Sequence, residues 1–94
     1  MTVDDCYQIG HVIKTHGLKG EVQLFLDVDN PLTYQEMESM LVQQNDSLIP
    51  FFIEHLQINP SKTIVKFEEV DDIEKAKELI ASKLFLPLTF LPEL

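Results

Sequence analysis

Apolar and polar residues alternate along much of this chain with a period of two, which is the period of a β-strand with one buried face. The alternation is clearest where Val22, Leu24 and Leu26 are separated by Gln23 and Phe25. Comparable runs, bounded by residues that favour turns, predict six strands. These strands are expected at Tyr7–Ile13, Glu21–Val28, Met40–Gln44, Leu48–Gln57, Thr63–Phe67 and Leu84–Leu88.

Two of the predicted strands carry further detail. In the first strand, we expect Tyr7, Ile9 and His11 on one face and Val12 on the opposite face. Pro50 lies inside the fourth strand and lacks a backbone N–H, so it predicts an edge position or a bulge there.

One segment has the spacing of a helix instead. Asp71 is followed three residues later by Glu74, which is the pattern of a capping box. Apolar residues then recur at helical spacing, at Ile73, Ala76, Leu79 and Ile80. We therefore predict a short helix that is capped by Asp71 or Asp72, reaches about Ile80 and turns its apolar side toward the barrel.

Six short strands with one helix before the last strand predict an all-β fold, a six-stranded antiparallel barrel. Tyr34 and Met37, in the loop after the second strand, are expected to cover one end of the barrel. The chain has 94 residues, enough for one domain. We expect residues 1–90 to form it.

The connection between the first two strands is bracketed by Gly17 and Gly20. Glycine accepts positive φ without a Cβ penalty, so we expect at least one of them to have positive φ in a tight turn. The two glycines could serve backbone shape alone, or the turn could hold an anion on its backbone amides. The candidate partner-binding residues around this turn are Lys14, His16, Leu18 and Lys19.

Charge favours a basic partner over nucleic acid. The chain has 16 acidic residues against 7 lysines, no arginine and a net charge of −9. Affinity for nucleic acid rests largely on Lys and Arg that neutralise phosphates, so direct RNA contact is expected to be weak at most. The alternative is that the acidity serves solubility only.

The sequence offers no convincing catalytic, cofactor or metal constellation. No two of the three histidines have the short spacing of a zinc site on one element. Cys6 is the only cysteine and follows two aspartates, which raise a thiol pKa and disfavour reactivity. One cysteine fits a reducing, cytoplasmic environment, and no apolar run approaches the roughly 18 residues of a membrane span.

The end of the sequence is more apolar than a free terminus needs to be. From residue 84 onward, leucine and phenylalanine alternate with prolines, as in a strand that runs into a docked linker. The alternative is that the segment folds back on its own barrel. The candidate docking residues are Leu88, Phe90, Leu91 and Leu94.

Several stretches, in the right order over nearly the whole chain, resemble the N-terminal region of the RimM family of bacterial ribosome maturation factors. They are Gly10, Lys14, His16–Val22, Asp29–Pro31, Phe67–Asp72, Ala76, Leu79 and Leu91–Pro92. The chain departs from the family at Glu69 and Ala81, where the family commonly has glycine.

The resemblance implies a barrel like the second domain of translation elongation factors. From residue 91 a linker would begin, leading to a C-terminal PRC barrel beyond this chain. The implied role is non-catalytic and needs no cofactor: assistance in 16S rRNA maturation and in assembly of the small-subunit head. The implied partner is a basic ribosomal protein of the head, which the family contacts through the PRC barrel.

Two other functions remain compatible with a small barrel, because a fold does not determine a function. A flavin- or nucleotide-binding barrel of the reductase type would need a stacking aromatic and a basic phosphate clamp, and the lack of arginine counts against it. A generic protein-interaction module is the third possibility. Precursor small-subunit RNA that accumulates on gene deletion would separate the maturation role from both.

Overall fold

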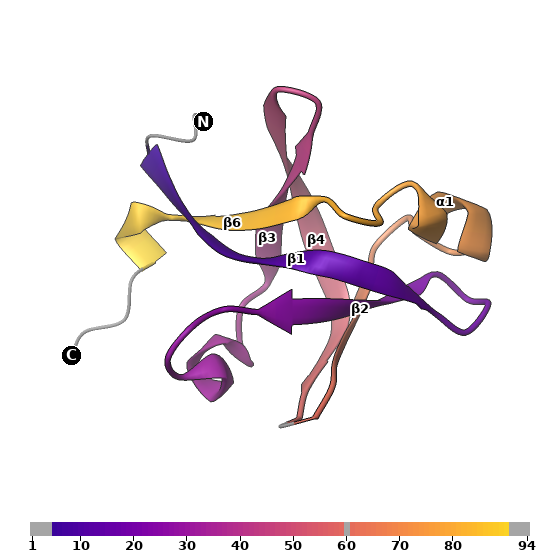
Figure 1. Cartoon of the computed structure of the whole chain (residues 1–94), viewed down its shortest axis with the longest axis horizontal. Helices are drawn as coiled ribbons and strands as arrows, with labels where there is room; N and C mark the ends of the chain where they lie inside the picture. The colour runs from indigo at the N-terminus through magenta and orange to yellow at the C-terminus, as the bar shows by residue number, and fades with distance from the viewer. Residues whose placement is uncertain (1–4, 60, 91–94) are drawn as a thin grey trace.

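Six antiparallel strands close into a barrel in the order β1-β2-β5-β4-β3-β6 (Figure 1). The computed structural model describes residues 5–59 and 61–90. The strands are β1 (Cys6–His16), β2 (Glu21–Leu26), β3 (Ser39–Gln44), β4 (Ser47–Ile58), β5 (Thr63–Phe67) and β6 (Lys83–Pro87). All six predicted strands are present, so the predicted fold class is confirmed.

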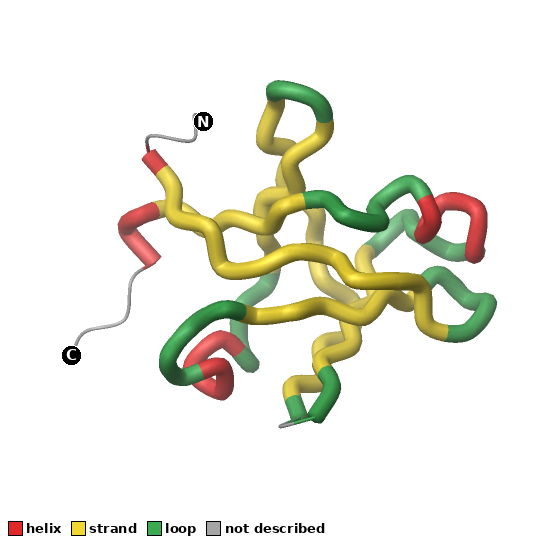
Figure 2. The backbone as a smooth tube through the Cα atoms, viewed as in Figure 1, coloured by secondary structure: helices red, strands yellow, loops and turns green. Residues whose placement is uncertain are grey.

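Three short helical segments lie in the connections and after the last strand (Figure 2). They are the 3₁₀ turn η2 (Pro31–Tyr34), the helix α1 (Ile73–Lys77) and the 3₁₀ turn η3 (Leu88–Phe90). The predicted last strand therefore ends one residue early, and Leu88 begins a helical turn. Helix α1 and the turn between β1 and β2 lie at one end of the barrel, and η3 lies at the other (Figure 1).

The facing predicted for the first strand is wrong. Ile9 and Val12 are both in the core, and His11 is exposed. The cause is two register shifts in β1, one against β6 between Gln8 and Gly10 and one against β2 between Val12 and Lys14. Irregularities of this kind interrupt the period-two alternation, so a residue an odd number of positions away can face the same side.

The edge position predicted for Pro50 is confirmed, although β4 as a whole pairs with two strands. Residues 47–52 of β4 pair with β3. The pairing of β4 with β5 begins only at Ile53. Pro50 therefore lies where the strand has a neighbour on one side, and its missing N–H costs no ladder hydrogen bond.

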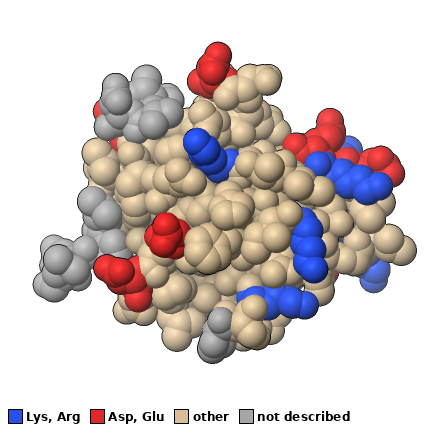
Figure 3. All heavy atoms as spheres, viewed as in Figure 1, with Lys and Arg blue, Asp and Glu red and all other residues tan. Residues whose placement is uncertain are grey.

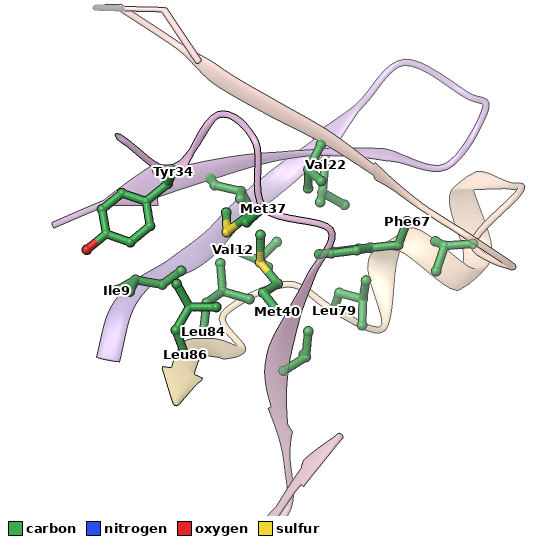
Figure 4. Packing of buried hydrophobic residues seen from close by; sticks show 14 of the residues in the cluster. Ile9, Val12, Val22, Tyr34, Met37, Met40, Phe67, Leu79, Leu84 and Leu86 are labelled. Carbon is green, nitrogen blue, oxygen red and sulfur yellow. The ribbon is translucent and has the colours of Figure 1, made fainter. Parts of the chain in front are cut away.

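The core fills the interior of the barrel (Figure 4). Val22 and Leu24 of β2 are buried, as their alternation predicts. Tyr34 and Met37, 5% and 6% exposed, cover one end as expected. The loop that carries them is held by Gln35, whose side chain donates to the carbonyl of Leu56 and accepts from the N–H of Ile58.

Candidate partner-binding surfaces

The glycine-bracketed turn has the backbone geometry that its sequence predicts. Gly17 has φ 71° and Gly20 has φ 100°, so both lie in the region that favours glycine. The two positions differ in their surroundings. An added Cβ at Gly20 would lie 2.7 Å from the carbonyl carbon of Val70, whereas one at Gly17 would meet nothing within 4 Å. Gly20 thus lets the turn lie directly on the segment that precedes α1.

The four candidate partner-binding residues all lie on or beside this turn. Lys14, Leu18 and Lys19 are exposed, Leu18 at 75%, and His16 is half-buried. Lys14 and His16 belong to the end of β1, whereas Leu18 and Lys19 form the tip. The structure brings the four to one end of the barrel, and their role in binding stays a prediction.

The helix beside the turn is shorter than predicted, and its cap is Asp72. The Asp72 side chain accepts a hydrogen bond of 2.8 Å from the N–H of Lys75, a contact typically worth about 1 kcal/mol. Helix α1 ends at Lys77, because the next three N–H groups bond to carbonyls three residues back. Ala76 and Leu79 are buried as expected, and Ile80 is 43% exposed.

The capping box predicted from Asp71 and Glu74 is wrong, because Asp71 has another partner. Its carboxylate lies 2.9 Å from the ammonium of Lys66, which also donates to Glu54 at 2.8 Å and to the carbonyl of Phe67 at 2.7 Å. All three ammonium protons are therefore used. This cluster ties β4, β5 and the start of the helical segment together.

Lys66 keeps its charge despite its burial. The side chain is 10% exposed, and desolvation alone would lower its pKa. The hydrogen bonds and charges of Glu54 and Asp71 outweigh this effect, so the pKa of Lys66 is raised above its ordinary value. A fully hydrogen-bonded ammonium of this kind is a structural group and a poor general base.

Two more residues at this end have left-handed backbone without being glycine. Glu69 has φ 69° and Ala81 has φ 72°. These are the two positions at which the chain departs from the resembling family by lacking glycine. Ala81 stops the helical segment, and its N–H bonds to the carbonyl of Val12 at 2.9 Å. The corner geometry is therefore kept, at a conformational cost that glycine would avoid.

A groove lies beside these corners, between β4, the segment after β5 and α1. Its volume is about 460 Å³. Its apolar lining includes Ile49 and Phe52, which are 38% and 57% exposed. We call it the acidic groove, because its charged lining residues are Glu68, Glu69, Glu78 and Lys75.

A second groove, of about 430 Å³, lies between β2, η2 and the connection from β4 to β5. Ile13, Phe25 and Leu32 line it and are 40%, 48% and 66% exposed. Among the described residues that line it, Lys62 is the only charged one, so we call it the apolar groove. Figure 3 shows the uneven charge, with acidic and lysine side chains gathered at the α1 end and few near the centre of the visible face.

The opposite end of the barrel carries the apolar segment after β6. Leu88 and Phe90 are 45% and 37% exposed, as predicted, and Leu91 and Leu94 lie outside the described residues. The ring of Phe90 stacks on Tyr34 at 5.7 Å, and the hydroxyl of Tyr34 lies 3.1 Å from that of Tyr7. The segment thus touches its own barrel on one side. Its docking role stays a prediction.

The described residues contain no group of three or more His, Cys, Asp or Glu side chains that could hold a metal ion. Cys6 is buried, and both burial and the charge of Asp5 raise the pKa of its thiol. A thiol in that state is a weak nucleophile. Among residues 5–59 and 61–90, no helix is long and apolar enough to cross a membrane.

The chain matches known sequences over its whole length. A family model of the RimM N-terminal domain matches residues 7–90. The ribosome maturation factor RimM of Christiangramia forsetii is 43% identical over 95 residues, covering 100% of this chain and 54% of the relative. RimM of Flavobacterium psychrophilum is 39% identical over 95 residues, covering 100% and 55%. The chain therefore spans about half the length of the curated relatives it matches.

Two solved structures have the same fold. The crystal structure of RimM from Pseudomonas aeruginosa superposes with a TM-score of 0.83 at 18% identity, covering 94% of this chain and 54% of that one. The solution structure of the RimM N-terminal domain from Thermus thermophilus gives a TM-score of 0.75 at 19% identity, covering 94% and 95%. At these identities the likeness concerns the fold alone.

Proposed function

Because the chain belongs to the RimM family, over its N-terminal domain, we propose that it works as part of a ribosome maturation factor, by binding and without catalysis. The observation that carries the proposal is the 43% identity to a named ribosome maturation factor across 100% of the chain. The role is assistance in 16S rRNA processing and in assembly of the head of the small subunit, in the cytoplasm.

The partner that the charge favours is a basic protein of the small subunit. The chain carries a net charge of −9 and no arginine, which attracts basic surfaces and repels phosphates. Ribosomal proteins of the head are the proposed targets, with weak direct contact to RNA at most. The turn residues Lys14, His16, Leu18 and Lys19 remain candidates for such contacts.

We also propose that a second barrel, of the PRC type, follows this domain in the whole protein. The relatives are about twice as long as this chain, which leaves room for such a domain. The exposed apolar side chains of Leu88 and Phe90 would dock on it, together with Leu91 and Leu94 beyond the described residues. Exposed apolar surface next to a domain junction supports this assignment.

Deletion of the gene tests the maturation role. We expect precursor 16S rRNA to accumulate and free small subunits to rise, with both restored by the full-length gene. Normal processing of 16S rRNA in the deletion strain would contradict the proposal. A flavin absorbance spectrum of the purified protein is the complementary test, because a bound flavin would favour the reductase-type alternative.

A further inference from the structure

We propose that the acidic groove binds an extended, basic segment of a protein partner, with apolar side chains of that segment placed between its lysines or arginines. The inference deepens the proposed function and rests on it, because it assigns a place on this domain to a basic partner. It is argued from the lining of the groove, its charge and the strand edge beside it.

The apolar lining of the groove is exposed without a partner. Phe52 presents a 57% exposed aromatic ring, and Ile49 is 38% exposed. Both lie in the half of β4 that pairs with β3 alone. Exposed aromatic and aliphatic side chains that line a groove are the usual anchors of a peptide contact.

The charged residues around this apolar lining determine which charge a partner should carry. Glu68, Glu69 and Glu78 are all exposed, and Lys75 is the one cation among the lining residues that the structure describes. The Lys75 ammonium is directed to the carbonyl of Glu69, at 3.4 Å. The lining therefore has an excess of two negative charges, which attracts lysine or arginine side chains at the rim.

The strand edge explains why the partner segment should be extended. The carbonyl of Phe52 accepts a hydrogen bond of 2.9 Å from the N–H of Glu68, so the backbone groups of Phe52 face away from β3. By the alternation of a strand, those of Pro50 and Leu48 face the same way. At Pro50 this edge offers only a carbonyl, which limits unspecific pairing yet accepts an N–H from an added strand.

The backbone conformation of Glu69 supports a binding role for the rim of the acidic groove. A glutamate with φ 69° holds a conformation that disfavours side chains with a Cβ. This position places a third carboxylate on the groove beside those of Glu68 and Glu78. Strained positions of this kind concentrate at sites where the side chain serves binding.

Two synthetic hexapeptides provide the probe, one that alternates lysine with valine and one that alternates glutamate with valine. Each is titrated into the ¹⁵N-labelled 94-residue chain while amide chemical shifts are recorded. We expect saturable shifts with the lysine peptide, concentrated at the residues from 48 to 52 that carry an N–H and at 68–70, and none with the glutamate peptide. Affinity should fall as salt rises from about 0.05 M to about 0.5 M.

The decisive variants each reverse two acidic charges, one pair in the acidic groove and one pair outside it. Glu68→Lys with Glu69→Lys should weaken the lysine peptide by about tenfold or more at low salt. Asp27→Lys with Asp29→Lys changes the net charge equally outside the groove and should weaken it far less. Phe52→Ser, at an exposed position, should also weaken binding by severalfold while leaving the fold intact.

Equal losses in the two charge-reversed proteins, or shifts spread away from the groove, would overturn the inference. So would equal binding of the glutamate peptide. These outcomes leave the maturation role untouched, because that role is tested by precursor 16S rRNA in the deletion strain. Conversely, normal rRNA processing together with groove-specific peptide binding would contradict the proposed function and leave the groove assignment standing.

Discussion

The two ends of the barrel are closed by different means. At the α1 end, closure depends on backbone geometry: four residues with positive φ, at Gly17, Gly20, Glu69 and Ala81, let loops turn and lie against one another. At the η3 end, closure depends on side chains, with Tyr34 and Met37 covering the core and Phe90 stacked on Tyr34.

This difference makes the α1 end of the barrel rigid and the η3 end adaptable. A left-handed corner in backbone contact has little freedom, so one added atom is enough to disturb it. An end covered by side chains, with the outer ring of Phe90 still 37% exposed, tolerates change and leaves apolar surface for a neighbouring domain. We therefore expect mutations at the α1 end to act on stability, and those at the η3 end to act mainly on docking.

The largest effect is expected at Gly20. Gly20→Ala adds a Cβ that overlaps the backbone of Val70 at a residue with φ 100°, and should cost about 3 kcal/mol or more of unfolding free energy. Gly17→Ala is the matched control, because φ is positive there and the space is open; it should cost about 1 kcal/mol. Urea denaturation measures both, and equal costs would refute the backbone-contact explanation.

A gain in stability is expected at the corner after α1. Ala81 has φ 72° and is exposed. Ala81→Gly removes the strain of a left-handed alanine and should stabilise the fold by about 0.5–1 kcal/mol, after the entropic cost of glycine in the unfolded chain. Thermal unfolding would show a higher midpoint. A lower midpoint would mean that this corner is not strained.

A smaller loss is expected at the η3 end. Phe90→Ala removes a ring that is 37% exposed and stacks on Tyr34. We expect a cost of about 0.5–1 kcal/mol in the 94-residue chain, the scale of one aromatic pair. In the full-length protein the cost should be larger, because the docking contact is lost as well. Equal costs in the two proteins would contradict the docking role.

The smallest effect is expected only in alkaline solution. The pKa of Lys66 is raised above its ordinary 10.5, so its contribution to stability is complete below pH 10.5 and is lost as pH rises through the folded-state value. The pKa of Tyr7 is also raised, by burial and its bond to Tyr34, so its loss runs in the same direction above pH 10.0. Denaturation between about pH 10 and 12 should therefore show a fall in stability that is shallower in Lys66→Met.

The sequence could predict the features that depend on neighbours in the chain. Alternation located all six strands, and two glycines separated by two residues located a tight turn with positive φ. The features that the sequence did not predict depend on contacts between residues far apart in the chain. The bulges of β1 are set by its two partner strands, so the facing of His11 and Val12 could not be read from β1 alone.

The candidate surfaces were less predictable than the fold. Asp71 looked like part of a cap because its partner Lys66 gives no local signal, and Lys66 pairs with Glu54 only once β4 and β5 are side by side. Neither groove corresponds to a motif, since each joins segments that lie far apart in the chain. The absence of glycine at Glu69 and Ala81 was visible, but its cost appears only with the backbone angles.

The measurement closest to the central claim is the sedimentation of the full-length protein in a cell extract. If this domain belongs to a factor that binds the small subunit during its maturation, tagged protein should sediment with immature small subunits and be depleted from complete ribosomes. The pattern should sharpen when maturation is slowed by cold. Protein that stays at the top of the gradient under every condition, while precursor 16S rRNA is present, would contradict the account.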